Sequence, residues 1–270
     1  MVGSSRGRRI VPGLLCFVLA APACTSSGPE PEESPATEAS PTVEAAPHWE
    51  YEGELGPENW ASISPLNAAC GDGKEQSPID LAGAVQADLA PIEFDYSPSQ
   101  LELHNNGHTI QATVEPGSSV TLDGTSYELV QFHFHLPSEH SVAGQPFAME
   151  AHFVHRDAGG RLAVVGSVLK EGEENEALDE IWDELPAEED GEVAISEPFP
   201  LDALYPAART YYRYPGSLTT PDCREGVTWS VFTDPVSVSA AQVEVYRSIF
   251  PVSNRPVQPL NDRTLQVVGS

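Results

Sequence analysis

The sequence predicts a single, mainly β domain with small peripheral helices. The chain has 270 residues, of which 40% are hydrophobic, and this is enough to bury one large core; all-β architectures of this size often form one domain. From residue 101 onward, short runs of strand-forming residues alternate with turns rich in Gly, Asn, Asp or Pro. Short connections of this kind favour antiparallel pairing.

The predicted strands cover residues 101–104, 109–114, 120–122, 127–135, 147–155, 162–169 and 228–232. Two later segments have helical spacing instead. The first has Asn175 as its cap, ends at Pro186, and carries a stripe formed by Leu178, Ile181, Trp182 and Leu185. The second begins after Ser239, with Gln242 completing a capping box, and its stripe is formed by Val243, Tyr246 and Phe250. We expect both stripes, including Trp182 and Tyr246, to pack against the β core.

The first 47 residues are predicted to lie outside this domain. Residues 1–23 place three arginines before an apolar stretch that is too short to span a bilayer, which is typical of a secretory signal peptide. Residues 24–47 are rich in Pro, Glu and small residues, and this composition predicts a disordered linker. The folded domain would occupy residues 48–270.

The end of the signal segment permits two interpretations. Ala21-Pro22-Ala23-Cys24 fits a small-residue cleavage site, and it also fits an imperfect bacterial lipoprotein box in which Cys24 becomes the lipidated first residue. Cys16 would be lost with the signal, and Cys70 and Cys223 can pair, so Cys24 would remain a free thiol unless it is lipidated. We therefore favour an exported protein, periplasmic or on the cell surface, with a membrane tether through Cys24.

The domain is strongly acidic. Residues 1–47 hold 5 of the 41 acidic and 3 of the 13 basic residues, which leaves 36 acidic and 10 basic residues for the rest of the chain. Binding to nucleic acid or to an anionic membrane surface requires positive charge, so the composition argues against both. A solvated acidic surface without a partner and a surface adapted to a salty medium both fit these numbers. No protein partner can be inferred.

Three histidines suggest a metal site. In the run Gln131 to His135, polar and aromatic residues alternate, so His133 and His135 share one face of a strand. His152, on a neighbouring strand, could supply a third ligand. Three imidazoles with an open fourth position are the ligands of a catalytic Zn²⁺ rather than a structural one. The alternative is the solvated face of an ordinary strand.

The residues around these histidines favour the metal. Gln131 lies two residues before His133, and Glu150 lies two residues before His152, so each shares a face with its histidine. A zinc-bound imidazole needs an acceptor for its other ring N–H, and Gln131 and Glu150 are placed to supply one.

Nine short strings in this order make the sequence similar to the α-class carbonic anhydrases, from about His48 to Arg263. They are His48-Trp49 with Tyr51, Gln76-Ser77-Pro78-Ile79, Asn105-Asn106-Gly107-His108, Gln131 through His135, Ser138-Glu139-His140, Glu150 with His152, Leu218-Thr219-Thr220-Pro221 with Cys223, Val227-Thr228-Trp229, and Asn254-Arg255-Pro256 with Gln258-Pro259. The resemblance implies that residues 48–270 form a catalytic domain. It further implies a central, twisted, mostly antiparallel sheet of about ten strands.

The resemblance also implies an activity: reversible hydration of CO2 to bicarbonate and a proton, by attack of a zinc-bound hydroxide on CO2. His133, His135 and His152 would bind zinc. The Thr219 hydroxyl would orient the hydroxide while donating its own hydrogen to Glu139.

Further roles follow from the same resemblance. A dry pocket for CO2 would be formed by Val154, Val164, Leu218, Thr220 and Trp229. His108 would be the proton shuttle, because an imidazole takes and releases protons near neutral pH; an exposed turn histidine is the alternative. A water path to it would be lined by Tyr51, Asn106 and Gln111, and Cys70 and Cys223 would form a disulfide. His104, His140 and His155 are expected to be structural or surface histidines.

Two other functional classes compete with this activity. An anhydrase-like binding or adhesion domain would typically lack one or more ligand histidines, whereas this chain retains all three. An extracellular zinc store would release its metal on mild chelation and would need neither Thr219 nor His108.

Overall fold

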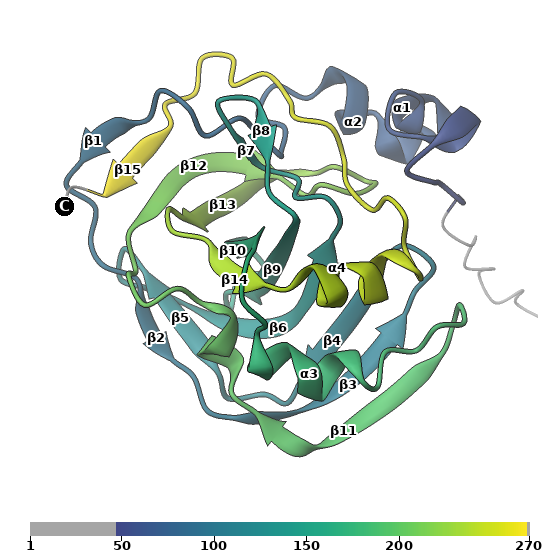
Figure 1. Ribbon diagram of the computed structural model, residues 1–270. Helices are drawn as coiled ribbons and strands as arrows, with labels where there is room; N and C mark the ends of the chain where they lie inside the picture. The colour runs from purple at the N-terminus through teal and green to yellow at the C-terminus, as the bar shows by residue number, and fades with distance from the viewer. Residues whose placement is uncertain (1–46, 269–270) are drawn as a thin grey trace, which may run out of the picture. The chain divides into compact units, whose positions relative to one another are not determined.

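The computed structural model describes residues 47–268 (Figure 1). The predicted signal peptide, Cys24, and all but the last residue of the predicted linker lie outside the described residues. Among the helices within residues 47–268, none is both long and apolar enough to cross a membrane.

The described part of the chain contains 15 strands. Their bounds are β1 Val85–Ala87, β2 Glu93–Asp95, β3 Ser99–Asn105, β4 Ile110–Val114, β5 Ser119–Leu122, β6 Thr125–His135, β7 Ser141–Val142, β8 Gln145–Pro146, β9 Met149–Arg156, β10 Leu162–Glu171, β11 Glu192–Phe199, β12 Tyr211–Ser217, β13 Glu225–Phe232, β14 Val236–Val238 and β15 Gln266–Val268. Every strand predicted from the sequence is among them.

Within residues 47–268, 13 strands form one sheet, whose main path runs β1-β15-β12-β13-β10-β9-β6-β4-β3-β11. β14 pairs with β10, and β5 pairs with both β2 and β6. Most pairs are antiparallel; β1 with β15, β10 with β13 and β10 with β14 are parallel. The predicted fold, a mostly antiparallel sheet of about ten strands, is confirmed, although the sheet has three strands beyond the ten of its main path.

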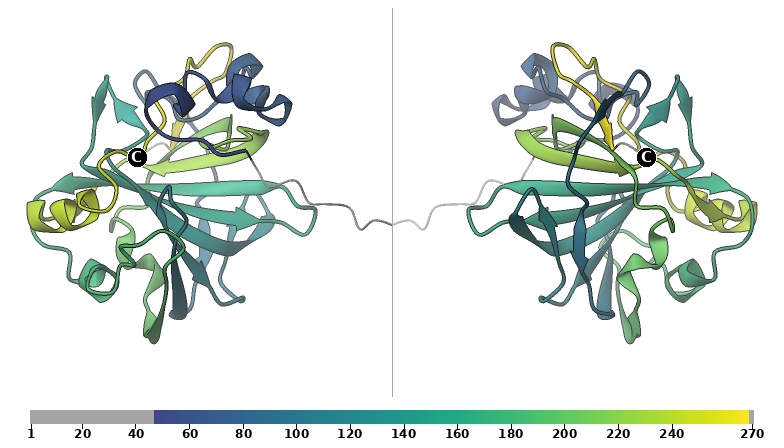
Figure 2. Two further views of the ribbon diagram at one scale, coloured as in Figure 1. Left: turned by 90° about the vertical axis from the view of Figure 1, so that its right-hand side faces the viewer. Right: turned by 90° about the vertical axis from the view of Figure 1, so that its left-hand side faces the viewer.

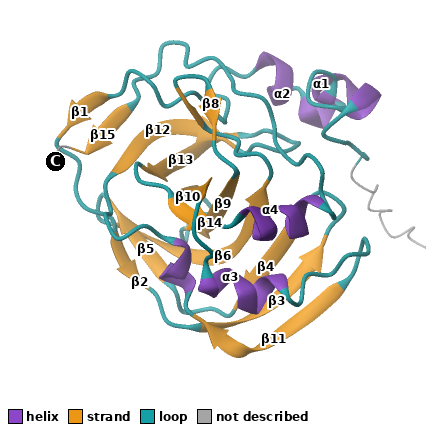
Figure 3. Cartoon of the chain, in the orientation of Figure 1, coloured by secondary structure: helices purple, strands orange, loops and turns teal. Residues whose placement is uncertain are grey.

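The helices are short and lie around the sheet (Figure 3). They are α1 Trp60–Ile63, α2 Ala69–Asp72, α3 Glu176–Trp182 and α4 Ala240–Arg247, with three 3₁₀ turns at Gly53–Leu55, Pro65–Asn67 and Leu201–Leu204. Asn175 caps α3 by accepting from the Ala177 N–H, and Ser239 with Gln242 forms a capping box on α4. The predicted caps of both helices are therefore confirmed.

The two faces of the sheet bury different clusters of apolar side chains. The larger cluster includes Phe132, Phe134 and Phe153, together with Trp182 and Tyr246 from the helices. A smaller cluster, formed by alternate residues of β10, β12 and β13, contains Val164, Val168, Tyr214, Val227 and Trp229. Figure 2 shows the strands crossing the middle of the domain, with the N-terminal helices (purple-blue) on one side and α4 (yellow-green) well away from them.

A buried arginine and a disulfide tie the N-terminal helices to later parts of the chain. Arg255 is 1% exposed and donates to the Gln76 carboxamide (2.9 Å) and to the Ser77 and Cys70 carbonyls (2.8 and 3.0 Å). Cys70 and Cys223 form the expected disulfide, with their Cα atoms 5.0 Å apart. Segments separated by more than 150 residues are thereby held together next to Thr219.

Candidate metal centre and its pocket

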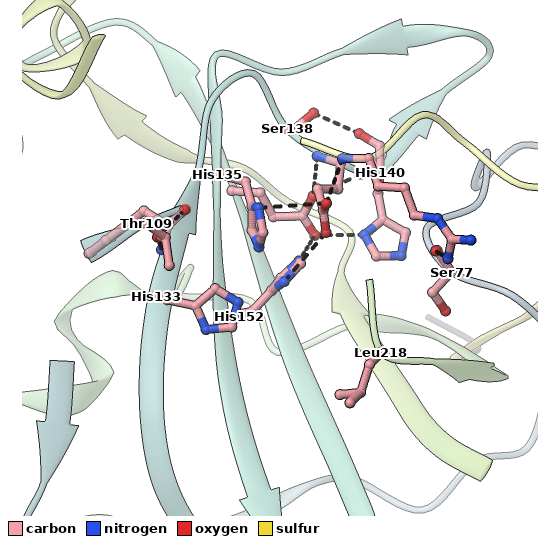
Figure 4. Close-up of polar contacts among 12 residues, drawn as sticks. Ser77, Thr109, His133, His135, Ser138, His140, His152 and Leu218 are labelled. Carbon is pink, nitrogen blue, oxygen red and sulfur yellow. Dashed lines mark hydrogen bonds and ion pairs between the residues drawn. The ribbon is translucent and has the colours of Figure 1, made fainter. Parts of the chain in front are cut away.

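The three predicted ligand histidines meet on one face of β6 and β9. These strands are antiparallel, and His133 lies directly opposite His152. Strand alternation places Phe132 and Phe134 in the core and turns His133 and His135 to the other face. One nitrogen of each of the three histidines lies within 4.8 Å of the others (Figure 4). The three imidazoles can therefore reach one ion.

Each imidazole has its other nitrogen beside an acceptor. His133 Nδ1 lies 2.9 Å from Gln131 Oε1, and His152 Nε2 lies 3.0 Å from Glu150 Oε1, which are the two partners expected from the sequence. His135 Nδ1 donates to the Ser253 carbonyl at 2.6 Å. This third acceptor could not be predicted from the sequence, since a backbone carbonyl has no residue signature.

The nitrogens that remain fit a metal ion. They are Nε2 of His133, Nε2 of His135 and Nδ1 of His152. His135 Nε2 is buried and has no hydrogen-bond partner among the described residues, and an unpaired buried nitrogen is costly unless it binds something. Three imidazole nitrogens suit Zn²⁺, with a fourth position left for a small ligand.

The electrostatics keep these imidazoles neutral, as metal ligands must be. Burial, reinforced by His135 and His152, holds the pKa of His133 well below its ordinary value. Burial lowers the pKa of His135 to about 4, although the Ser253 carbonyl opposes the change. Burial also lowers the pKa of His152, against the opposing effect of Glu150.

A second group, formed by His140, Glu150 and His152, is also close enough to hold an ion. Hydrogen bonds account for it instead. His140 Nδ1 lies 2.7 Å from Glu150 Oε1, and His140 Nε2 lies 2.7 Å from the Tyr214 hydroxyl. Burial alone would raise the pKa of Glu150, but His140 and His152 hold it well below its ordinary value. His140 therefore orients the carboxylate that orients His152, and Tyr214 is a contributor that sequence reasoning missed.

Thr219 interacts with Glu139, whose carboxyl group lies 3.8 Å from Nδ1 of His152. Thr219 follows the end of β12, and the Glu139 side chain is fully buried. Burial raises the pKa of Glu139 to about 7, while His152, the Arg255 N–H and the Thr219 hydroxyl act to lower it. Glu139 Oε1 accepts from the Arg255 N–H at 2.8 Å, whereas Oε2 has no partner of regular geometry among the described residues. The Thr219 hydroxyl thus acts on this carboxyl group.

A cavity of about 460 Å³ opens beside the histidines. Two of the ligand histidines, His133 and His152, line it together with Thr219. All five residues predicted to form the substrate pocket also line it, namely Val154, Val164, Leu218, Thr220 and Trp229. Figure 4 shows Leu218 beside the histidines. A small apolar molecule in this cavity would touch both the apolar wall and the open side of the ligand set.

The predicted proton path lies outside that lining. His108 is half-buried and stacks on Trp49, with ring centroids 3.7 Å apart and an interplanar angle of 13°. Burial lowers its pKa, while the Glu50 carboxylate opposes this shift. The Asn106 side-chain oxygen accepts from the His108 and Thr109 N–H groups and thereby shapes the turn. The structure therefore places His108 against Trp49 rather than among the pocket residues.

The other two residues predicted for the proton path have clear positions. Gln111 on β4 lies opposite His133 on β6 in the sheet register. The Tyr51 hydroxyl is buried without a hydrogen-bond partner among the described residues, and burial together with Glu139 raises its pKa well above 10. Tyr51 therefore carries a neutral phenol within the field of Glu139.

Comparisons with known proteins agree on one family. The family model for eukaryotic-type carbonic anhydrase matches residues 55–268. The chain is 41% identical over 219 residues to a carbonic anhydrase of Pectobacterium carotovorum, covering 81% of this chain and 90% of that protein. It is also 42% identical over 221 residues to one of Klebsiella pneumoniae, with the same coverage.

Solved structures give the same result. The α-carbonic anhydrase of Thermovibrio ammonificans, determined in complex with the inhibitor sulfanilamide, superimposes with a TM-score of 0.80 at 44% sequence identity. The match covers 83% of this chain and all of that structure.

Proposed function

The chain belongs to the eukaryotic-type, or α-class, carbonic anhydrase family, and on this basis we propose that it binds Zn²⁺ and catalyses the reversible hydration of CO2 to bicarbonate and a proton. The observation that carries the proposal is the set of three neutral imidazoles of His133, His135 and His152. In each of them one ring nitrogen lies beside an acceptor, and the other is free to bind an ion shared by all three. A zinc ion held there supplies a nucleophile by acidifying water, chemistry for which carbonic anhydrases are themselves the standard example.

The protein's own contribution is orientation. Thr219 donates its hydroxyl hydrogen to Glu139, so that its oxygen can act only as an acceptor toward the attacking oxygen. The Arg255 N–H, 2.8 Å from Glu139 Oε1, fixes the carboxyl group in place. Reactants that are already oriented lose less entropy on reaching the transition state than two freely tumbling ones. Glu139 and Thr219 therefore act as a directional pair.

The apolar wall positions CO2. Val154, Val164 and Leu218 offer no hydrogen bond, so they exclude water from the side that the apolar substrate enters. An aryl sulfonamide, such as the sulfanilamide bound by the Thermovibrio relative, is expected to enter the same pocket. Trp229, buried and held by its indole N–H to the Ser217 carbonyl at 2.9 Å, closes the base of the pocket.

Proton release completes the cycle. We propose that His108 takes the proton through water ordered by Tyr51, Asn106 and Gln111, and passes it to solvent. His108 stacks on Trp49, and rotation about its side-chain bonds would turn the imidazole toward the pocket to collect the proton.

Replacing His108 with alanine is expected to lower turnover at low buffer concentration by about tenfold. This is less than the roughly 100-fold contribution of a fully positioned proton-transfer group, because buffer and water carry part of the flux. Stopped-flow hydration with increasing imidazole should restore the rate. His104→Ala, on β3, is the matched control. Unchanged turnover of His108→Ala at low buffer would assign the shuttle to another group.

The N-terminal assignments remain proposals. We propose that residues 1–23 are a signal peptide, that residues 24–47 are a linker and that residues 48–270 are the catalytic domain, held outside the cytoplasm by a lipid on Cys24. The composition of these segments supports this. Mass spectrometry of the mature N-terminus distinguishes a lipidated Cys24 from a released chain.

The hydration assay itself tests the proposed function. Zinc-loaded protein should hydrate CO2 in a stopped-flow experiment, should lose this activity when a chelator removes the metal, and should regain it when Zn²⁺ is returned. A binding domain or a zinc store would hold metal without any hydration, and that result would refute the proposed activity.

A further inference from the structure

The charge of the pocket contrasts with that of the rest of the chain. Residues 48–270 hold 36 acidic and 10 basic residues. The lining of the cavity nevertheless contains no aspartate or glutamate, and it contains two arginines, Arg156 and Arg224. Chance placement from this composition would favour carboxylates by more than three to one. The cavity is therefore a cationic opening in an anionic protein.

The two arginines lie at the outer end of the cavity. His152 at the inner end is 1% exposed, whereas Arg156, the last residue of β9, and Arg224, which follows the disulfide, are exposed. Gly160, in the turn between β9 and β10, lines the same opening. A molecule that travels between solvent and the histidines passes these guanidinium groups.

Neither guanidinium group has an ion-pair partner within residues 47–268. Two nearby carboxylates are engaged elsewhere. Asp157 pairs with Arg161 at 2.6 Å, and Glu225 accepts from the Glu75 N–H at 2.7 Å and from Gln76 at 3.1 Å. Glu128 lies opposite Arg156 in the strand register but is not within ion-pair distance of it.

The remaining acid close in sequence does not neutralise Arg224 either. Asp222 Oδ1 receives only the backbone N–H of Arg224, at a long 3.4 Å. Both arginines thus keep their side-chain donors for a ligand.

We propose that Arg156 and Arg224 form an anion subsite at the mouth of the pocket that takes bicarbonate, an inference that rests on the proposed function. Bicarbonate is the charged carbon species of the reaction, and its planar oxyanion matches the fork of donors on a guanidinium group. CO2 is uncharged and passes the same groups without comparable attraction. The subsite would offset the repulsion that the acidic surface otherwise imposes on an approaching anion.

Equilibrium binding is the appropriate readout for such a subsite. The ratio of kcat/KM for hydration and dehydration is fixed by the equilibrium constant, so no substitution can shift it. A group that stabilises bound bicarbonate changes KM and kcat together and leaves kcat/KM nearly unchanged. Binding of a charged probe separates this effect from the chemical step.

The experiment compares two ligands of the same shape. 4-Sulfamoylbenzoate and its uncharged methyl ester share a sulfonamide group for the inner end of the pocket, and their 4-substituents then point toward its mouth. Calorimetry with the full-length, zinc-loaded protein at low ionic strength should show the carboxylate binding about threefold to tenfold more tightly than the ester, as expected for two exposed charge pairs. This preference should vanish in about 1 M salt.

Variants localise the effect. Arg156→Gln/Arg224→Gln should abolish the preference while leaving ester binding unchanged. Arg209→Gln/Arg247→Gln makes the same change in net charge at two exposed, ion-paired arginines outside the lining, and it should retain the preference.

Three results would count against the anion subsite, and a fourth against the proposed function. Equal binding of both ligands to the wild type, a preference that survives in Arg156→Gln/Arg224→Gln, or an equal loss in the control variant would overturn the subsite. Failure of both ligands to bind the zinc-loaded wild type would instead overturn the proposed function, and the subsite with it.

Discussion

Replacing His135 with alanine is expected to remove zinc from the protein and to abolish CO2 hydration. His135 is fully buried, its Nδ1 is held by the Ser253 carbonyl, and its Nε2 has no other partner among residues 47–268. Loss of the hydrogen-bond partner of a metal ligand already lowers metal affinity by about 10- to 100-fold, so loss of a ligand should cost more than about 100-fold. Zinc content after dialysis and stopped-flow hydration measure the two effects.

Two controls separate metal loss from misfolding. His155→Ala removes a different fully buried histidine, which lies on β9 and whose Nε2 forms a hydrogen bond with the Tyr96 hydroxyl. This variant should be less stable but should retain zinc. Gln131→Ala leaves all three ligands in place and should weaken zinc binding by about 10- to 100-fold. If His135→Ala kept a stoichiometric zinc ion and normal hydration, the assignment of this ligand would be wrong.

Breaking the Cys70–Cys223 disulfide is expected to cause the largest loss of stability. The cross-link spans 153 residues, and in the chain-entropy model closing so long a loop stabilises the folded state by about 5 kcal/mol, although measured values are often smaller. Denaturant unfolding of the Cys70→Ala/Cys223→Ala variant should show this decrease in the free energy of unfolding. Reduced wild-type protein should show a similar decrease, because it loses the same cross-link.

The same change should impair the site. The Cys223 N–H donates to the Thr220 carbonyl at 2.8 Å, and the Cys223 carbonyl accepts from Gln76 at 3.0 Å. These bonds anchor the segment that carries Thr219. Hydration by the reduced protein should therefore fall under conditions where it is still folded. A reduced protein with unchanged stability and unchanged activity would contradict both parts of this prediction.

Periodicity predicted the strands that carry the ligands, and it failed where the periodic signal is weak. β6 and β9 have long alternating or apolar runs, and both were predicted. β12 was not predicted, because Pro215 and Gly216 interrupt it, and both residues argue against a regular strand. β11 was not predicted either, because it contains Pro198. The structure tolerates this proline because β11 lies at the edge of the sheet. β1, β2, β14 and β15 have only three residues each, too few to show a period.

In the site, too, contacts that follow from local strand geometry were predictable, and contacts between distant parts of the chain were not. Gln131 and Glu150 lie two residues from the histidines that they orient, so strand geometry alone was sufficient to predict their positions. The Ser253 carbonyl lies 118 residues from His135 in the sequence, and Tyr214 lies 74 residues from His140. Such contacts depend on how the whole chain folds. The stacking of His108 on Trp49 was missed for the same reason.

The most direct test of the metal centre is anomalous X-ray diffraction from crystals of the zinc-loaded protein, measured on both sides of the zinc absorption edge. We expect one zinc peak at about 2.0–2.1 Å from Nε2 of His133, Nε2 of His135 and Nδ1 of His152, with its fourth position open toward the cavity lined by Thr219 and Leu218. A zinc peak at His140 and Glu150, or a fourth ligand from the protein itself, would contradict it.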